Sequence, residues 1–138
     1  MKNHRISVIM SAYNTERYIA EAIESILNQT FKDFEFIIID DGSTDDSLKI
    51  IKRYVKKDRR IKLIHNKKNI GLTKSLNKGL KIAKGQYIAR MDADDISLPQ
   101  RFQIQYDFLE KNKDIFLIGT TAFLIDDKGD RLGRAHIK

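Results

Sequence analysis

Short apolar runs alternate with longer amphipathic stretches over the first hundred residues of this chain. Four runs have the length and the composition of β-strands: residues 6–10, 34–39, 61–64 and 87–91. They are almost continuously apolar, as is typical of strands that are covered on both faces. Between them, apolar side chains recur every three or four positions, which predicts three helices: residues 15–29, 45–57 and 72–83.

Each predicted helix has an apolar face. The side chains expected to point inward are Ile19, Ala22, Ile23, Ile26 and Leu27 in the first helix, Leu48, Ile51 and Val55 in the second, and Leu72, Leu76, Leu80 and Ala83 in the third. Gly85 marks the expected end of the third helix.

The pattern is less regular beyond the fourth apolar run. Pro99 suits the first turn of a fourth helix. Its expected inward side chains are Phe102, Tyr106 and Leu109. Residues 115–125 are expected to return as a strand and residues 126–130 to form a turn. The last dozen residues are polar, and no closing element is predicted for them.

Strands that alternate with helices indicate βαβ units and a mostly parallel sheet. We therefore predict an α/β fold, a three-layer sandwich with helices on both faces of a central sheet. Residues 1–138 are expected to form a single domain, because this length is typical of one. A domain of this size buries roughly two-thirds of its unfolded surface, so it needs no disulfide or metal to fold.

Asp92, Ala93, Asp94 and Asp95 directly follow the fourth apolar run. Side chains alternate along an extended chain, so Asp92 and Asp94 are expected to project to the same side. Two carboxylates on one side repel each other unless a cation lies between them, and Mg²⁺ or Mn²⁺ prefers such oxygen ligands. An acidic turn leading into the next helix is an equally good interpretation of these four residues alone.

Polar residues also follow the other three predicted strands. They are Ser11, Ala12, Tyr13 and Asn14 after the first, Asp40 to Asp45 after the second, and Asn66 to Gly71 after the third. Open α/β sheets bind ligands beyond the carboxyl ends of their strands, where these segments converge. The convergence favours the metal interpretation of Asp92 and Asp94.

Two of these segments have structural alternatives. Asn14 could simply cap the first helix. Ser43 and Asp46 match a capping box, and the capping role is favoured for both. Of the adjacent acids Asp40 and Asp41, one is expected to turn toward solvent while the other accepts hydrogen bonds from a base or a ribose.

Aromatic and basic side chains near the strand ends also allow two interpretations. Tyr13 either packs at the edge of the core or stacks on a flat ring. Lysines 67, 68 and 74 either contact phosphate or form a solvated basic loop. His65 is expected to be structural.

The chain is basic, with 26 Lys and Arg against 19 Asp and Glu and a net charge of +7. Such a charge suits an anionic partner, such as nucleotide phosphates, nucleic acid or lipid headgroups, or merely a solvated basic surface. The absence of cysteine excludes a disulfide framework and a thiolate zinc site, and fits a reducing compartment. No signal peptide and no membrane-spanning run is recognised, so a cytoplasmic location is expected.

Six segments occur in a characteristic order: ISVIMSAYN (6–14), SILNQTF (25–31), EFIIIDDGSTD (35–45), NIGL (69–72), NKGL (77–80) and GQYIARMDADD (85–95). In their order and spacing, over residues 5–125, the chain resembles the N-terminal half of a family 2 glycosyltransferase with the GT-A fold. Each segment alone is a weak signal, but their succession is specific.

The resemblance implies an inverting enzyme that transfers a sugar from a nucleotide-diphospho-sugar, often a uridine one, to a saccharide or lipid-linked hydroxyl. It implies bound Mn²⁺ or Mg²⁺ and a role in polysaccharide biosynthesis at the cell envelope. The implied donor-binding residues are Ser11, Ala12, Tyr13, Asn14, Asp40, Asp41, Gly71, Lys74, Asp92 and Ala93. In this scheme Tyr13 stacks on the base, Asp41 accepts a hydrogen bond from it, and Asp94, with Asp92, holds the metal; Asp95 is a supporting ligand.

The catalytic base is the point of departure from the family. It is expected beyond Lys138, in an acceptor-binding half that this chain lacks, and Asp126, Asp127 and Asp130 are not assigned to the role. Such a fragment would bind donor yet transfer sugar poorly. Apolar surface left uncovered would favour a homo-oligomer, and the positive charge suits peripheral contact with the cytoplasmic face of a membrane.

Three other classes of protein are alternatives to this family. A receiver-type signalling domain needs acids after its first strand, where this chain has Ser11 to Asn14. A nucleotidyltransferase usually carries a basic, glycine-rich loop at that place. The remaining alternative is a non-catalytic module that binds a nucleotide sugar or nucleic acid; nucleic acid is not the expected partner, and its binding would weaken steeply with salt.

Overall fold

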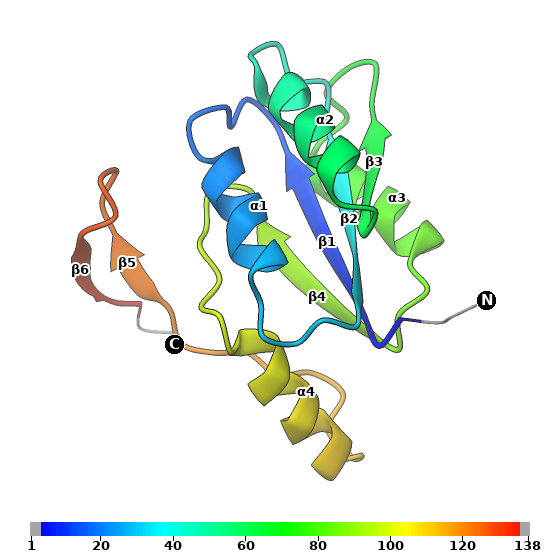
Figure 1. Cartoon of the computed structure of the whole chain (residues 1–138), viewed down its shortest axis with the longest axis vertical. Helices are drawn as coiled ribbons and strands as arrows, with labels where there is room; N and C mark the ends of the chain where they lie inside the picture. The colour runs from blue at the N-terminus through cyan, green and yellow to red at the C-terminus, as the bar shows by residue number, and fades with distance from the viewer. Residues whose placement is uncertain (1–3, 136–138) are drawn as a thin grey trace. The chain divides into compact units, whose positions relative to one another are not determined.

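The computed structural model describes residues 4–135, and the chain divides into two compact units, Met1–Gln103 and Ile104–Lys138 (Figure 1). The first unit contains β1 (Ile6–Ala12), α1 (Ile19–Leu27), β2 (Phe34–Asp40), α2 (Ser47–Lys57), β3 (Ile61–His65), α3 (Leu72–Ile82), β4 (Tyr87–Asp92) and the start of α4 (Arg101–Lys111). The rest of α4 lies in the second unit with β5 (Phe123–Ile125) and β6 (Arg131–Arg134). The single domain over residues 1–138 stays a prediction.

The first unit is built on a parallel sheet with the strand order β3-β2-β1-β4. Crossover connections between parallel strands are right-handed, so the direction of each step decides which face its helix covers. The steps from β1 to β2 and from β2 to β3 run one way and place α1 and α2 on one face. The step from β3 to β4 runs the other way, and α3 covers the opposite face (Figure 1). The predicted three-layer α/β fold is confirmed.

The face under α3 corrects one prediction. Gly79 of α3 lies over Ile9, Ile37 and Ile39; a Cβ atom at position 79 would come within 2.7 Å of Ile9 Cγ2. The buried positions of α3 are therefore small ones, Ser75 and Gly79, and the helix can approach the sheet closely. The prediction that Leu72 and Leu80 point inward is wrong, since both are about half exposed.

The other predicted faces agree better with the structure. In α1 the side chains of Ile19, Ala22, Ile23 and Ile26 are buried, as predicted. In α2 Ile51 is fully buried, and in α4 Phe102 is buried.

Three helices begin later than predicted. α1 begins at Ile19, after a turn, and α4 begins at Arg101, two residues beyond Pro99. α2 begins at Ser47, whose N–H donates to Asp45 Oδ1 at 2.9 Å. The predicted capping box of Ser43 and Asp46 is therefore wrong, because the side chain that serves the first turn of α2 belongs to Asp45.

Glu35 is a charged side chain that is fully buried in β2. Its Oε1 accepts hydrogen bonds from Ser7 Oγ and from the Lys84 N–H, each at 2.6 Å, and its Oε2 lies 2.5 Å from Lys62 Nζ. Burial raises the pKa of Glu35, but the bonds from Lys62, Ser7 and Lys84 outweigh burial and hold it below 4.5. This cluster joins β1, β2 and β3 to the segment after α3.

The second unit differs from its predicted form. β5 pairs antiparallel with β6, and Asp126 Oδ1 accepts hydrogen bonds from the N–H groups of Lys128 and Asp130 in the turn between them. The turn at 126–130 is thus confirmed. The predicted strand is wrong over residues 115–122, and the polar end does contain a closing strand, β6. An apolar run becomes a strand only where a partner strand pairs with it, and within residues 115–125 pairing reaches only 123–125.

No helix within residues 4–135 is both long enough and apolar enough to cross a lipid bilayer.

Candidate functional site at the carboxyl edge of the sheet

The strand order reverses between β1 and β4, and open α/β sheets bind ligands beyond the carboxyl ends of the strands at such a reversal. Ser11 is the register partner of Asp92, and Ala12 is the partner of Asp40. The last residues of three strands therefore lie level with one another. The structure brings together Ser11, Ala12, Asp40 and Asp92, four residues expected at the site.

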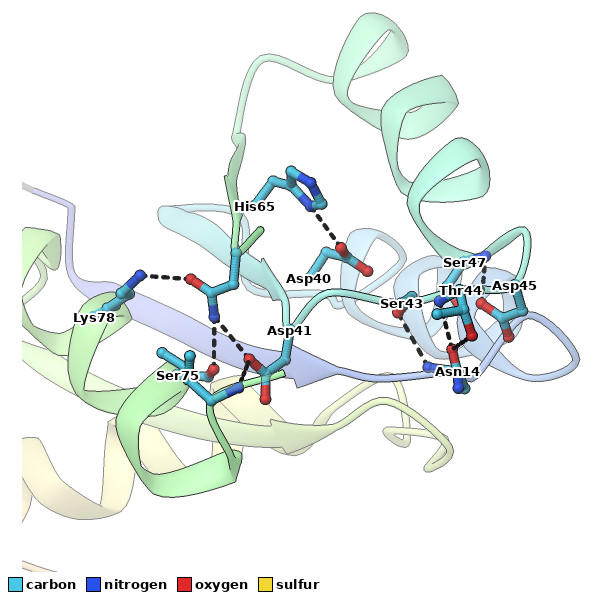
Figure 2. Close-up of polar contacts among 12 residues, drawn as sticks. Asn14, Asp40, Asp41, Ser43, Thr44, Asp45, Ser47, His65, Ser75 and Lys78 are labelled. Atoms are coloured by element: carbon cyan, nitrogen blue, oxygen red, sulfur yellow. Dashed lines mark hydrogen bonds and ion pairs between the residues drawn. The ribbon is translucent and has the colours of Figure 1, made fainter. Parts of the chain in front are cut away.

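The loop after β1 is joined to the loop after β2 (Figure 2). Asn14 Oδ1 accepts a hydrogen bond from the Thr44 N–H at 2.8 Å, and the Asn14 N–H donates to Ser43 Oγ at 3.1 Å. Asn14 has a φ of 51°, in the left-handed region that asparagine tolerates better than most residues. Asn14 therefore does not cap α1, and it links two loops instead.

Three more hydrogen bonds extend this link. The Thr15 N–H donates to Ser47 Oγ at 2.8 Å, and the Glu16 N–H donates to Asp45 Oδ2 at 3.0 Å. In return the Asp46 N–H donates to Glu16 Oε2 at 2.8 Å. Tyr13, directly before the linked residues, is 46% exposed, so its ring is open to solvent on a loop that is held in place.

Asp40 is fully buried at the end of β2. Its Oδ2 lies 2.8 Å from His65 Nδ1 on the neighbouring strand (Figure 2), while its Oδ1 is buried without a hydrogen-bond partner among the described residues. Asp41 is buried as well, so the prediction that one of these acids turns to solvent is wrong. His65 contributes the partner of a buried carboxylate, which agrees with its expected structural role.

The carboxylate of Asp41 holds the loop after β3 (Figure 2). Its Oδ1 accepts hydrogen bonds from Asn66 Nδ2 at 2.8 Å and from the Ile70 N–H at 2.9 Å, and its Oδ2 accepts one from the Gly71 N–H at 2.9 Å. Burial raises the pKa of Asp41, but the bonds from Ile70, Asn66, Ser75 and Gly71 outweigh burial and hold the pKa below 3.8. The carboxylate is thus ionised and already supplied with protein donors.

Gly42 lets the loop after β3 pass directly over the end of β2. Its φ of 72° is left-handed, and a Cβ atom there would lie 2.5 Å from the Lys68 carbonyl carbon and 2.7 Å from the Asn69 nitrogen. Gly71, with a φ of 91°, then turns the chain into α3, where Lys74 lies exposed in the first turn. The approach of backbone to backbone at Gly42 requires glycine on two counts.

The acidic segment, Asp92–Asp95, is much less constrained. Asp92 is partly exposed and its Oδ1 lies 2.9 Å from Arg90 Nη2, whereas Asp94 and Asp95 are exposed. Ala93, between them, is buried. Although the residue is exposed overall, desolvation of its carboxyl group by neighbouring atoms, together with repulsion from Asp92 and Asp94, raises the pKa of Asp95 above its ordinary value of 3.8. These carboxylates therefore repel one another in the protein as it stands.

Gln29 holds the chain just beyond the acidic segment. Its Nε2 donates to the Leu98 carbonyl at 2.7 Å and to Ser97 Oγ at 3.2 Å, and its Oε1 accepts from the Phe102 N–H at 3.0 Å. Gln29 is fully buried. The acidic segment therefore lies between two fixed points, β4 and the residues that Gln29 binds, while its own carboxylates remain accessible.

The carboxylate oxygens of the acidic segment are ligands that suit a hard divalent cation. Within residues 4–135 no three acidic or histidine side chains are already grouped as a complete metal site. Mg²⁺ commonly binds proteins through one or two carboxylates, taking its other ligands from water and substrate phosphates. Asp92 and Asp94 offer such an incomplete set of ligands. A cation bound between them would reduce the repulsion among Asp92, Asp94 and Asp95.

Several contacts of this edge were missed from sequence. Asn66 Oδ1 accepts a hydrogen bond from Lys78 Nζ at 2.6 Å, and Asn66 Nδ2 donates to Ser75 Oγ at 2.9 Å. The spacing of Ser75 and Lys78 on one helical face was a usable signal. The pairing of Glu16 with Asp45 left no such signal, because it depends on how two separate loops meet.

Comparisons with known proteins agree on one family. A family model for "Glycosyl transferase family 2" matches residues 7–136. An uncharacterized glycosyltransferase of Methanocaldococcus jannaschii is 47% identical over 129 residues, 92% of this chain and 44% of that protein. The chain spans less than half the length of such curated relatives.

Two solved structures resemble the fold. TarS (1-349) of S. aureus in complex with UDP-GlcNAc has a TM-score of 0.74 and 32% identity, over 79% of this chain and 32% of that chain. The mannosyltransferase PcManGT of Pyrobaculum calidifontis, in complex with GDP-Man and Mn²⁺, has a TM-score of 0.66 and 25% identity, over 75% and 31%.

Proposed function

The chain belongs to glycosyl transferase family 2, and we propose that its sheet edge binds a nucleotide-diphospho-sugar together with a divalent cation, for transfer of the sugar to a hydroxyl acceptor. The resemblance predicted from the sequence is thereby confirmed at the level of the family. Donor, cation and transfer are the proposal.

The pairing of Ser11 with Asp92 across the reversal of strand order is the observation that carries the proposal. It puts the loop that carries the exposed ring of Tyr13 and the acidic segment directly beyond the ends of two adjacent strands. A nucleotide sugar has a flat base at one end and a diphosphate at the other. An aromatic ring suits the base, and a cation held by carboxylates suits the diphosphate.

The residues divide the work accordingly. The fixed loop after β1 presents Tyr13 to the base, and Asp92 and Asp94 are the proposed cation ligands, with Asp95 in support. A bound Mn²⁺ or Mg²⁺ would supply Lewis-acid stabilisation for the departing diphosphate. Lys74, exposed in the first turn of α3, is the proposed phosphate contact.

Asp41 receives a different role from the one expected. Its three protein hydrogen bonds already satisfy much of the accepting capacity of its two oxygens. We propose that it orients the loop 66–71 beside the donor rather than serving mainly as a partner of the base. Its contact with the base stays a prediction.

A uridine donor is favoured over a guanosine one. TarS, complexed with UDP-GlcNAc, is 32% identical to this chain, against 25% for the mannosyltransferase complexed with GDP-Man and Mn²⁺. The acceptor, a saccharide or a lipid-linked saccharide, and the catalytic base belong to the whole protein; the base is expected in a segment beyond Lys138. A nucleotide-sugar-binding module without transfer activity is the alternative function.

Calorimetric titration of UDP tests the proposal, with Mn²⁺ present and with a chelator in its place. We expect binding to the wild type that requires Mn²⁺ and is lost in Asp94→Ala. Asp114→Ala, which removes an exposed acid of the second unit, is the matched control and should bind normally.

Two results would contradict the proposal. Equal binding of UDP with and without Mn²⁺ would contradict the proposal that a cation takes part in binding. Absence of binding to UDP, GDP and their sugar conjugates by the folded wild type would remove the donor site.

A further inference from the structure

A row of cations runs along the outer face of α2. We call these cations the α2 basic stripe: Lys49, Lys52, Arg53 and Lys56. Lys52 and Arg53 lie three and four positions after Lys49, and Lys56 lies four and three positions after them, so all four share one side of the helix. All four are exposed. The inward side of the same helix buries Ser47 and Ile51. The helix thus separates an apolar face from a face that is positively charged along its whole length.

The stripe lines a shallow surface hollow of about 470 Å³, together with Ser43, Asp45 and Leu48. Charge in this hollow is mostly uncompensated. Lys49 lies 3.4 Å from Asp46, with both side chains 63% exposed, and such exposed pairs contribute little. Lys52, Arg53 and Lys56 form no ion pair among the described residues. Asp45 is already engaged by the N–H groups of Glu16 and Ser47.

We propose that the α2 basic stripe docks this protein onto an anionic lipid surface. Its first and last members are seven positions apart, so the charges extend over about 10 Å along the helix axis, which suits a plane of headgroups. Three of the four are lysines, which act as point charges toward phosphate rather than as planar, bidentate readers. The only aromatic ring of α2, Tyr54, is bound to Glu24 of α1 and lies outside the hollow, so stacking on nucleic-acid bases has no support here.

The location of the stripe gives the docking a consequence. The amino end of α2 follows directly from the loop of Ser43 to Asp46, which is hydrogen-bonded to the loop that carries Tyr13. A surface that holds α2 would therefore lie near the carboxyl edge of the sheet, where a lipid-borne acceptor has to arrive. That consequence rests on the proposed function, whereas the docking itself does not.

Co-sedimentation of the full chain with lipid vesicles tests the proposal. The vesicles contain phosphatidylcholine alone or phosphatidylcholine mixed with phosphatidylglycerol. The stripe variant carries Lys49→Gln, Lys52→Gln, Arg53→Gln and Lys56→Gln. The control variant carries Lys32→Gln, Lys81→Gln, Lys111→Gln and Lys128→Gln, four exposed lysines elsewhere. Each variant changes the net charge from +7 by four, to +3.

We expect the wild type to bind the anionic vesicles only, and to lose binding as the salt concentration rises past the range in which surface charges act. The stripe variant should lose at least about tenfold in partitioning, because each cation near an anionic membrane contributes to binding. The control variant should lose much less. Far-UV circular dichroism and Mn²⁺-dependent UDP binding report on folding and on the donor site independently of the vesicles.

Three outcomes would overturn the docking proposal while leaving the donor site untouched. The folded wild type fails to bind anionic vesicles. The stripe variant and the control variant lose binding equally, which would make total charge the cause. A duplex DNA oligonucleotide binds the wild type more tightly than the vesicles do and depends on the stripe, which would identify nucleic acid as the partner.

Discussion

The two sides of the candidate site are built in opposite ways. On one side, the segments after β1, β2 and β3 form what we call the linked edge: residues 13–16, 41–47 and 66–71 joined by backbone-to-side-chain hydrogen bonds. On the other side, the carboxylates of the acidic segment repel one another, and the ion pair of Asp92 with Arg90 is exposed. One side is complete as it stands, and the other has unmet charge.

The difference teaches which part of a ligand each side suits. A base and a ribose are uncharged, and the base is flat, so the side proposed to meet them gains from being rigid in advance. A diphosphate is highly charged, and its binding is improved by a site whose own charges are relieved by a shared cation. The same contrast predicts that substitutions at the linked edge lower stability, while substitutions in the acidic segment lower ligand binding.

The largest loss of stability is expected from Asp41→Ala. Three donors of the loop 66–71, the Asn66 amide and the N–H groups of Ile70 and Gly71, would lose their acceptor in a buried place. We expect the free energy of unfolding to fall by about 3 kcal/mol. Urea denaturation measures it, with Asp94→Ala as the exposed counterpart, expected within about 0.5 kcal/mol of wild type. Equal losses in the two variants would remove the distinction between the two sides.

Gly42→Ala is expected to lower the free energy of unfolding somewhat less than Asp41→Ala does. The loss should exceed that of its control variant by about 2 kcal/mol. The new Cβ atom meets the backbone of Lys68 and Asn69, and the backbone remains left-handed. Gly129→Ala is the control, because its φ of 88° is also left-handed but no heavy atom beyond its own chain neighbours lies within 4 Å of the added carbon. Thermal unfolding compares them; similar destabilisation in both would show that the loop after β3 yields without cost.

Acid should lower stability gradually through the same buried carboxylates. Asp41 and Glu35 have pKa values below their ordinary 3.8 and 4.5 because hydrogen bonds favour the ionised forms. Their contribution is complete above those ordinary values and is lost as the pH falls through the lowered ones. Urea midpoints measured from about pH 6 down to about pH 3 should therefore decline, and the decline should be shallower in the double variant Asp41→Asn, Glu35→Gln. Parallel pH profiles would contradict this assignment.

The smallest change is expected from Asp92→Asn. Its ion pair joins side chains that are 59% and 45% exposed, so its loss should lower stability by less than about 0.5 kcal/mol. Metal-dependent UDP binding should weaken in the same variant. A clear fall in the free energy of unfolding of Asp92→Asn would show that Asp92 stabilises the fold as the residues of the linked edge do.

The order of elements could be predicted from sequence because burial leaves a periodic trace. Continuous apolar runs indicated the four parallel strands, and the spacing of Ile19, Ala22, Ile23 and Ile26 indicated the buried side of α1. The same reasoning was wrong for α3, because Gly79 and Ser75 face the sheet and hydrophobicity does not register a close approach. It was wrong again over residues 115–122, where apolar composition is not accompanied by a pairing partner.

The sequence predicts where the site residues lie, but not which hydrogen-bond partners they have. That Ser11, Asp40 and Asp92 reach one edge follows from their places at the ends of parallel strands. That Asp40 and Asp41 are both buried does not, because it depends on His65 and Asn66 arriving from β3 with suitable donors. Loop-to-loop bonds such as that of Glu16 with Asp45 require the folded chain, since neither residue has a local pattern that names the other.

The pairing of β1 with both β2 and β4 also bears on the order in which the protein folds. β1 meets β2 after one short helical connection, but Ile6 meets Tyr87 only after most of the first unit has intervened. Contacts between segments so distant in the chain form slowly, because the entropy of closing the loop is lost before the contact forms. We expect hydrogen exchange during refolding to protect β1, β2 and β3 first and β4 last. The acidic segment would then join a linked edge that has already formed, and a nascent chain would acquire the proposed cation ligands at the end of folding.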